Sequence, residues 1–377
     1  MAQGMQTSYV GTVPQKRVVS DRILFSDPMD IPLINAFGLD AESKFKFVNA
    51  PGKVYEWLED AYSDVSDIVN SGLASDSTTT TFSATDGSKF HVGDIVLIES
   101  EYVIVSGISS NTVTIERNHS GTQATHANST VAYIVSQARL EGATASDSHF
   151  TQPTSGYNYS FILHKNIEIS RSDARLQRYG IPNLIDYEID KKMDELKIQL
   201  TKKPYFGVRD AGSATTNRDC GGLDVFISTN TTNCSTAALT LKNIEDMVQT
   251  IWGYGGNPSL LICGGWAKRK IASFFEGAVR TERSEKFGGV EITKIQTAMG
   301  PTLDVLVDRY IDIGSSTGKL YLTDPEKISF VTIDEFFYED LAKTKDTAAY
   351  GQIVGEYGLA VANEKHHGKV YGFSLSA

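Results

Sequence analysis

Two adjacent histidines near the carboxyl end of the chain are the residues best suited to carry out chemistry. His366 and His367 follow Glu364 and Lys365 in the stretch "YGQIVGEYGLAVANEKHHGKVYGF". Imidazole and carboxylate groups bind metals and transfer protons near neutral pH. On a strand, however, successive side chains point to opposite faces, so the two histidines could not bind one ion together.

The residues before the histidines alternate in the way that indicates a strand. Ile353, Tyr357, Leu359 and Val361 share one face, while glycine and alanine occupy the other. Continued through the histidines, the strand would cover about 20 residues and roughly 65 Å. Ordinary strands have about 5–6 residues, so this length suggests a surface that is shared with a neighbouring molecule.

No other group of residues has the spacing of a reaction centre. His119 and His126 could share a metal, but we find no carboxylate or cysteine at a suitable spacing. The glycines of "GYGGNP" at 253–258 lie between a predicted helix and a strand, which is the order of a turn and not of a phosphate-binding loop. We therefore expect no catalytic, cofactor-binding or metal-binding residues, and no enzyme activity.

The composition of the 377-residue chain is that of a folded protein with more than one core. The formal net charge of −11 argues against a protein that grips nucleic acid, because phosphate binding needs clustered Lys and Arg. Cys220, Cys234 and Cys263 are odd in number and widely spaced, so we expect free thiols in the core or in loops. No run reaches the ~18 apolar residues of a membrane-spanning helix.

The first part of the chain predicts an arm, an aromatic hairpin and a small β module. Glycine, proline and polar residues interrupt any period over 1–40, apart from the apolar anchor "DPMDIPLINAFGL". Aromatic residues alternate between Phe45 and Trp57 on either side of a Pro-Gly turn, which is typical of a hairpin. Residues 76–137 contain five short β-type runs, which indicate an antiparallel sandwich or barrel inserted into a larger domain.

The second part predicts a long helix followed by an α/β lobe. Apolar residues recur at helical spacing over 183–203, and Pro204 should end that helix. Residues 240–313 alternate between helical and strand patterns, and 319–333 has the pattern of a further hairpin. The apolar stripe of the long helix consists of Ile185, Ile189, Met193, Leu196 and Leu200.

This order of elements resembles the major capsid proteins of tailed double-stranded DNA bacteriophages, which have the Hong Kong 97-type fold. The end of the chain is similar to a motif of one branch, "GE-aromatic-x-L-x-V-x-N-E-x-x-H-G", although Gly358 stands where that branch more often has Thr. The stretches "FVNAPGKVYEWLEDAY", "RLEGATASD" and "NIEISRSDARLQRYGI" are similar to the same branch. The motif residues are Gly355, Glu356, Tyr357, Leu359, Val361, Asn363, Glu364, His367 and Gly368.

The resemblance implies an α+β capsid fold with a spine helix, a long terminal strand and an inserted all-β module. The parts that it implies are an N-terminal arm (1–40), an extended loop (41–75 and 138–165), the module (76–137), a peripheral domain (166–235 and 321–377, with the spine helix at 183–203) and an axial domain (236–320).

The function that the resemblance implies is structural. The chain would self-assemble into pentamers and hexamers of an icosahedral phage head around double-stranded DNA, and it would be assembled in the host cytoplasm and reside in the virion. Its partners would be other copies of itself, a separate scaffolding protein or none, and portal and cement proteins, with DNA as non-specific content and no membrane. The alternative is a phage tail or adhesion protein whose β module binds carbohydrate or a receptor.

Six residues are candidates for contacts between subunits, on the combined grounds of pattern and resemblance. Two are aromatic residues of the extended loop, and four belong to the terminal motif. They are Tyr55, Trp57, Glu356, Asn363, Glu364 and His367.

Overall fold

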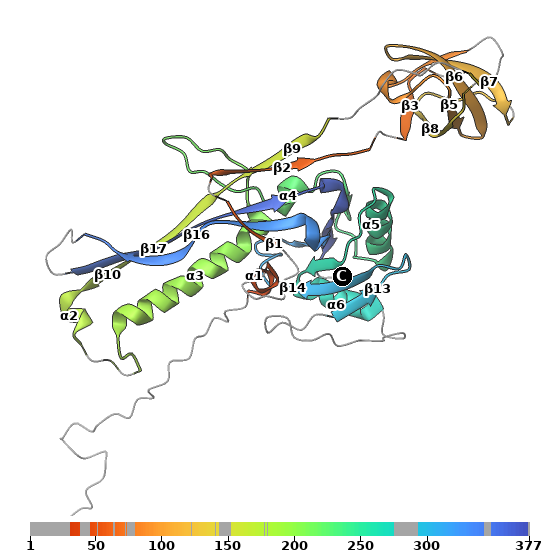
Figure 1. Cartoon of the computed structure of the whole chain (residues 1–377). Coiled ribbons are helices and arrows are strands. Elements are labelled where there is room, and N and C mark those ends of the chain that lie inside the picture. Colours follow the sequence, from red (N-terminus) through yellow and green to blue (C-terminus); the bar gives the residue numbers. More distant parts are fainter. Residues whose placement is uncertain are drawn as a thin grey trace, which may run out of the picture. The chain divides into compact units, whose positions relative to one another are not determined.

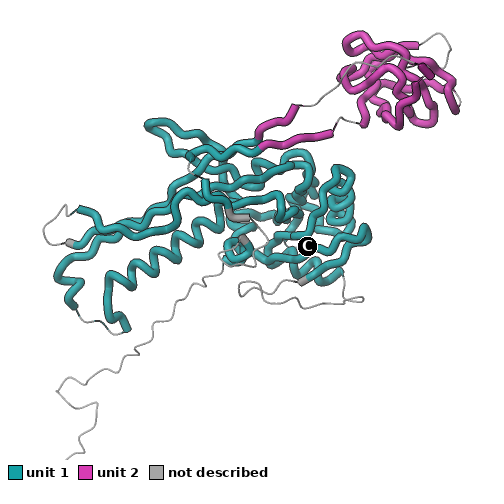
Figure 2. Tube along the Cα trace, viewed as in Figure 1, with its two compact units in different colours: residues 1–57, 156–377 teal, residues 58–155 magenta. Residues whose placement is uncertain are grey.

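The chain forms two compact units, which Figure 2 colours separately: residues 1–57 with 156–377, and residues 58–155. The structure is a computed structural model. It describes residues 31–37, 46–50, 52–62, 65–71, 73, 80–121, 123–139, 141–142, 152–176, 178, 180–274, 293–342 and 348–375. Most of the predicted N-terminal arm therefore lies outside the described residues.

A four-stranded sheet forms one half of the first unit, with the strand order β1-β16-β17-β10. Only the pair β1–β16 is parallel, and the other two pairs are antiparallel. Ile353, Tyr357, Leu359 and Val361 are all buried, so the predicted apolar face of this strand is confirmed. The strands are β1 (Lys46–Asn49), β10 (Phe161–Ser170), β16 (Ile328–Asp340) and β17 (Ala348–Val361).

The predicted long helix is α3 (Leu184–Phe206), which lies along this sheet (Figure 1). Asn183 caps its start by accepting a hydrogen bond from the amide of Ile185 at 3.0 Å. We expected the helix to end before Pro204, and this prediction is wrong. The helix continues to Phe206 with the proline in its last turn, and the amide of Gly207 bonds to Lys203 O at 2.8 Å.

The apolar stripe of α3 packs as the sequence predicts. Leu196 is completely buried between α3 and the sheet, where it joins Ile167, Ile169 and Ile353. Ile185, Ile189 and Met193 pack against the same cluster, and Leu200 enters the neighbouring core. The period of 3.6 residues thus identified the buried face of the helix correctly.

A six-stranded mixed sheet forms the other half of the first unit, with the order β11-β18-β15-β12-β14-β13. Leu261 and Leu322 face a cluster that includes side chains of α5 and α6, while Leu260 and Ile262 face the cluster that includes α1 and the end of α3. Both faces are therefore buried. The elements are α1 (Pro32–Phe37), α5 (Leu241–Gly253), α6 (Gly265–Phe274), β11 (Thr231–Asn233), β12 (Leu260–Cys263), β13 (Thr293–Gln296), β14 (Thr302–Val307), β15 (Thr317–Thr323) and β18 (Gly368–Ser374).

The prediction of one continuous terminal strand is wrong. Strand β17 ends at Val361, and Asn363 adopts a left-handed conformation with φ of 52°. A short 3₁₀ turn, η3 (Glu364–His366), then leads to β18, which pairs with β15 in the other sheet. The alternation of residues does not predict this turn, because the turn depends on the backbone angle of a single asparagine.

The predicted hairpin at 319–333 is also wrong. Strands β15 and β16 belong to different sheets, and the 3₁₀ turn η2 (Pro325–Lys327) joins them. Asp324 accepts a hydrogen bond from the amide of Glu326 at 3.1 Å and so caps this turn. After β15, the chain therefore crosses from one sheet to the other twice, through η2 and through η3.

The aromatic stretch around the Pro-Gly turn is not a local hairpin either. Strand β1 pairs with β16, whereas β2 (Val54–Glu59) pairs with β9 (Thr154–Tyr159), about a hundred residues later in the sequence. Two short helices, α2 (Arg171–Ala174) and α4 (Leu223–Phe226), complete the first unit. Of the helices that the structure describes, none is long and apolar enough to cross a membrane.

The second unit contains a six-stranded antiparallel sheet, β3-β8-β5-β6-β7-β4. A bridge between Val69 and Ala84 joins the ends of β3 and β4, so the sheet closes into a small barrel around Phe82, Val103 and Ile115. Each of the five predicted runs contains a strand. The elements are β3 (Ser66–Val69), β4 (Thr81–Ser83), η1 (Gly87–Lys89), β5 (Asp94–Ile98), β6 (Glu101–Ser109), β7 (Thr112–Ser120) and β8 (Thr130–Gln137).

Two features of the second unit were not predicted. Strand β3 lies in the range assigned to the extended loop, yet it pairs with β8 at the edge of the barrel sheet. The unit also has twelve acidic residues against three basic ones between residues 58 and 155, so it carries −9 of the formal net charge of −11. The three cysteines, all in the first unit, are free, and Cys220 and Cys263 are buried.

Candidate assembly surfaces

The strand pair β2–β9 holds the two aromatic candidates. Tyr55 and Trp57 are half-buried and pack against the small cluster that contains Val331. The indole of Trp57 also lies 5.8 Å from the ring of Phe226, measured between centroids. Leu58, the next residue of β2, is 79% exposed. The free apolar surface of this strand is therefore formed by Leu58 and not by Trp57.

Glu356 on β17 forms an ion pair within the chain. Its carboxylate bonds to the guanidinium of Arg218 and accepts a hydrogen bond from Ser160 Oγ at 2.5 Å. Arg218 Nε also donates to Ser160 O at 2.7 Å. These three residues fasten the loop after α3 to the start of β10 and to β17.

Asn363 and Glu364 belong to the turn that leads into β18. Glu364 accepts hydrogen bonds from the backbone amides of Ser228 and Thr229 at 2.8 and 2.5 Å. Burial raises the pKa of Glu364, but these bonds outweigh it and hold the pKa below its usual range. A charged carboxylate thus organises the loop after α4.

His367 is completely buried at the two crossings between the sheets. Its Nδ1 accepts the amide proton of Asp324 at 3.3 Å, and Nε2 donates to Ala362 O at 3.1 Å. Burial lowers the pKa of His367 to about 4, although the bond to Ala362 acts in the opposite direction. The imidazole is thus neutral at pH 7 and bonds to both crossings. Its buried side chain offers no surface to a neighbour.

The structure separates the other histidines that we considered for metal binding. His126 is buried and its two ring nitrogens lie beside Glu99 and Glu101, whereas His119 is exposed on β7. Among the residues that the structure describes, no group of three or more His, Cys, Asp or Glu could hold a metal ion.

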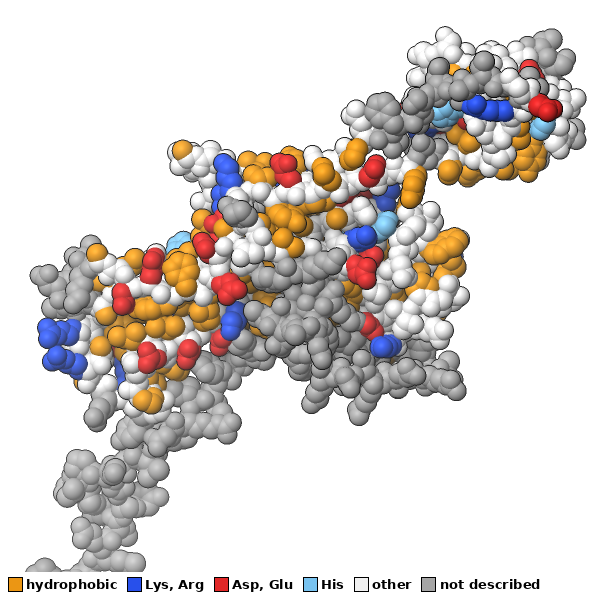
Figure 3. All heavy atoms as spheres, in the orientation of Figure 1, with side chains coloured by type: hydrophobic (Ala, Val, Ile, Leu, Met, Phe, Trp, Pro, Cys, Tyr) orange, Lys and Arg blue, Asp and Glu red, His pale blue; other side chains and the backbone are white. Residues whose placement is uncertain are grey.

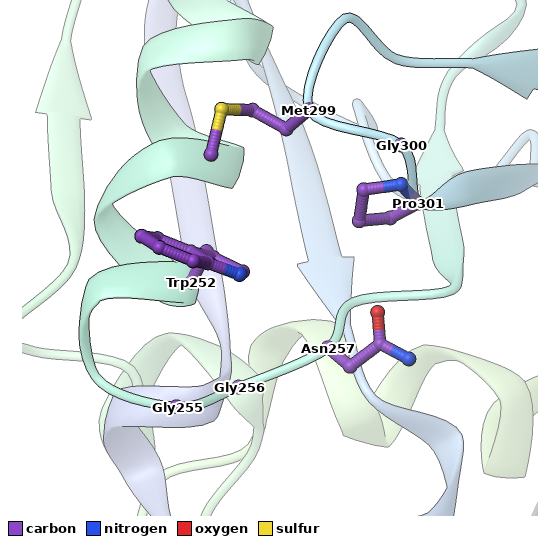
Figure 4. Close-up of a pocket in the computed structure, with 7 residues that line it drawn as sticks. All are labelled: Trp252, Gly255, Gly256, Asn257, Met299, Gly300 and Pro301. Carbon is purple, nitrogen blue, oxygen red and sulfur yellow. The ribbon is translucent and has the colours of Figure 1, made fainter.

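An open cavity of about 390 Å³ lies at one end of the second sheet, where α5 meets the turn between β13 and β14. It is lined by Trp252, Asn257, Met299, Pro301 and three glycines, and the side chain of Met299 extends from its turn toward α5 (Figure 4). Trp252 is 60% exposed. The predicted turn "GYGGNP" forms one wall, as Gly255 and Gly256 belong to the lining.

Hydrophobic side chains also reach the surface of the barrel unit (Figure 3). Along β8, Val131, Tyr133 and Val135 alternate outward, and Ile68 of β3 lies opposite Val131. Exposed apolar side chains in a contiguous set mark interaction surfaces more often than isolated ones do. The arm, the cavity at α5 and the barrel therefore each offer apolar surface.

A family comparison shows what kind of protein carries these surfaces. The model of the SU10 major capsid protein family matches residues 5–374, almost the whole chain. The chain belongs to the SU10 major capsid protein family. It is a structural capsid subunit, which assembles with copies of itself. None of the curated proteins matches the chain.

Solved structures show that this SU10-family chain has the Hong Kong 97-type capsid fold. A chain of Mycobacterium phage Cain covers 99% of this chain and is itself covered completely, with 10% identity and a TM-score of 0.51. A chain of Mycobacterium phage Bobi covers 96%, with 97% of it matched, 8% identity and a TM-score of 0.50. The capsid of a native GTA particle covers 97%, with 97% of it matched, 9% identity and a TM-score of 0.50.

Several residues that organise this capsid subunit were missed by the sequence analysis. Asn158 is buried, donates to Gly221 O at 3.0 Å and Leu359 O at 2.5 Å, and accepts from the amide of Gly221 at 2.9 Å. Asn230 donates to Lys365 O and His367 O at 2.7 and 2.9 Å. The one sequence signal was a polar residue beside a strand, which does not distinguish a buried amide from a surface residue.

Proposed function

We propose that this capsid subunit forms pentamers and hexamers of an icosahedral phage head that encloses double-stranded DNA. The family supports a capsid made of many copies. The observation that carries the finer proposal is the exposed apolar rim of the cavity at α5, where Trp252 and Met299 are 60% and 40% exposed. A neighbouring copy would cover this rim and remove its apolar surface from water.

The six candidate residues enter the proposal with different roles. Tyr55 and Trp57 would shape the β2–β9 arm for contact with a neighbour, and Glu356, Asn363 and Glu364 would lie at or near such contacts. His367 would act only through the crossings that it fastens, because its side chain is buried.

The proposal includes a division of the chain into parts, in which β3 (Ser66–Val69) belongs to the module and not to the extended loop. The parts are an arm (1–40), an extended loop (41–75 without β3, and 138–165), a module (76–137 with β3), a peripheral domain (166–235 and 321–377) and an axial domain (236–320). The proposal also includes assembly in the bacterial cytoplasm, a separate scaffolding protein, and portal and cement proteins as partners. The acidic net charge of −11 supports a wall that encloses DNA without binding it tightly. A tail or adhesion role is not favoured, because the family match covers residues 5–374.

Electron microscopy of the purified chain tests the proposal. Negative staining and size-exclusion chromatography would be applied to the chain alone and with a co-expressed scaffolding protein. Closed shells, or rings of five and six subunits, are the expected result. A stable monomer under both conditions would contradict it.

A pair of variants tests the rim itself. Trp252→Ser removes the most exposed aromatic side chain of the cavity, and Val92→Ser makes a similar change at a position that is 52% exposed on the barrel unit. Trp252→Ser should abolish rings and shells while the midpoint of unfolding stays unchanged. Val92→Ser should leave rings and shells intact. If Trp252→Ser leaves them intact too, or if both variants abolish them, the rim is not the ring contact.

A further inference from the structure

The sheet of the barrel unit carries apolar side chains on its outer side as well as in its core. Val96 and Ile98 of β5 belong to the core. Ile95 and Leu97 alternate with them and therefore point outward. The same alternation holds on β6 and β8. The outward apolar side chains, which we call the outer barrel face, are Ile68 of β3, Ile95 and Leu97 of β5, Tyr102 and Ile104 of β6, and Val131, Tyr133 and Val135 of β8.

The register of the strands joins these side chains into one surface. Tyr133 lies opposite Leu97, and Leu97 lies opposite Tyr102, so an apolar row crosses β8, β5 and β6. In the next row, Ile95 lies opposite Ile104. Side chains that lie opposite each other have Cβ atoms about 4.5–5.5 Å apart. The outer barrel face is therefore continuous over neighbouring strands.

The outer barrel face covers only one side of the barrel. Tyr133 and Val135 on this side are 50% and 54% exposed. On β4 and β7, by contrast, the outward positions are polar and include Thr81, Thr114 and Glu116. Antiparallel sheets that meet water on their outer side usually carry polar residues there. A contiguous apolar surface on one side of the unit thus marks an interaction site.

The distribution of charge favours a second copy of the same face as the partner. All side chains of the outer barrel face are uncharged, whereas the unit has twelve acidic residues against three basic ones. Glu116 lies opposite Ile104 at the edge of the face, and Glu99 lies in the turn that follows β5. Two identical faces therefore meet without placing like charges opposite each other. A basic partner would instead be drawn to the acidic residues outside the face.

The size of the face also fits a neighbouring subunit. Interfaces that hold two free proteins together have about 20–30 residues on each side. The outer barrel face is much smaller, so it is not sufficient to hold two free subunits together. Capsid subunits are held beside one another by other contacts, and such tethering gives an effective concentration of roughly a millimolar. A small apolar contact forms readily under these conditions.

We propose that the outer barrel face packs against the outer barrel face of a neighbouring subunit in the assembled capsid. Two apolar sheet faces pack about 10 Å apart with interdigitating side chains. The row at Tyr133 then lies close to the same row of the neighbour, and its apolar surface is removed from water. The proposal rests on assembly with copies of the same chain, and it requires no particular number of subunits in a ring.

Cross-linking in assembled particles tests the contact. Tyr133→Cys places a thiol within the face, and Thr81→Cys places one at an exposed position on the polar side of the barrel. A short bismaleimide should convert Tyr133→Cys particles to covalent dimers on a denaturing gel. Thr81→Cys and the native chain, with its three cysteines, should stay monomeric on the same gel.

The outcomes of this experiment separate the present proposal from the proposed function. Shells that assemble from Tyr133→Cys but give no cross-linked dimers would overturn the barrel contact and leave the pentamers and hexamers standing. A native chain that remains monomeric would overturn both.

A pair of opposite charges tests whether the face meets itself. Tyr133→Asp or Tyr133→Lys alone brings like charges together across a symmetric contact, so these particles should dissociate at a lower denaturant concentration than native ones. Particles from an equal mixture of the two variants should recover part of this resistance, because opposite charges then meet. Thr81→Asp and Thr81→Lys, alone or mixed, should behave as the native chain does. A mixture that is no more resistant than the single variants would show that the face meets a different surface, and the proposal would be wrong.

Discussion

Gly156 on β9 lies directly against the indole of Trp57 on β2, so closely that a Cβ atom at Gly156 would stand 2.5 Å from the indole Nε1. The packing of this strand pair therefore requires a glycine at position 156, because the indole ring occupies the space that a side chain would need. On its other side, the indole packs near Phe226. The conformation of this arm is thus set by packing within the subunit, before any neighbour is considered.

Gly156→Ala should displace the indole of Trp57 and destabilise the first unit by about 1–3 kcal/mol, because overpacking forces side chains from their preferred positions. Chemical denaturation of the full chain measures the change. The matched control is Gly52→Ala in the same arm, where the nearest atom to a new Cβ would be Val54 O at an ordinary 3.5 Å. Equal destabilisation by the two variants would mean that contact with the indole is not the cause.

Leu58→Ser should prevent shell formation without changing the free energy of unfolding, because the side chain is 79% exposed in the subunit. Trp57→Ala should lower both, since the indole packs inside the subunit as well. Sedimentation of assembled particles and denaturation of the subunit separate the two effects. Normal shells from Leu58→Ser would show that β2 does not contact a neighbour through this side chain.

The ion pair of Arg218 and Glu356 should show a coupling energy of about 1–3 kcal/mol in a double-mutant cycle, because hydrogen bonds to partly buried charged groups are stronger than exposed ones. Their side chains are 22% and 18% exposed. Alanine variants, single and double, would be compared by denaturation. Lys242 and Asp246 on α5 form the control pair, with side chains 79% and 56% exposed. There the coupling should be about 0.3–0.5 kcal/mol, and equal values for the two pairs would contradict the argument.

Stability of the first unit should fall in acid as His367 becomes charged. The pKa of His367 is lowered to about 4 in the folded chain, whereas an unfolded histidine has a pKa of about 6.5. Between these values the unfolded state binds more protons, so the free energy of unfolding decreases as the pH falls from about 6.5 to about 4, by about 3 kcal/mol in total. Denaturation over this pH range measures the slope.

The variant His367→Gln separates this effect from the acid response of the carboxylates. Glutamine can accept a hydrogen bond and donate another, but it does not titrate. Its slope between these two pH values should be shallower than that of the native chain. An unchanged slope would assign the acid sensitivity to other groups.

Periodicity predicted the elements whose burial follows a simple repeat. The stripe from Ile185 to Leu200 identified α3 and its buried face, and alternation from Ile353 to Val361 identified β17. Both predictions depend on many residues at once, so a single exception does not affect them. The end of α3 was mispredicted, because Pro204 is tolerated in the last turn of a helix that ends soon after it.

The elements that were mispredicted depend on one residue or on distant partners. The break after Val361 follows from the left-handed backbone of Asn363. The partners of β1 and β2 are β16 and β9, which no local pattern identifies. The candidate site shows the same limit. Sequence pointed to Glu356, yet its partner Arg218 lies 138 residues away in a loop without any periodic pattern.

The two crossings between the sheets, through η2 and through η3, are fastened to each other. The amide of Ala362 donates to Lys327 O at 2.9 Å, and His367 bonds to Asp324 on one side and Ala362 on the other. Residues of both sheets also share one core, in which Phe330 of β16 and Ile262 of β12 belong to the same cluster. The two halves of the first unit are therefore one packed body, and the bonded crossings add polar contacts at its edge to the apolar contacts at its centre. A load applied to one sheet of an assembled subunit would be transmitted to the other sheet through both kinds of contact.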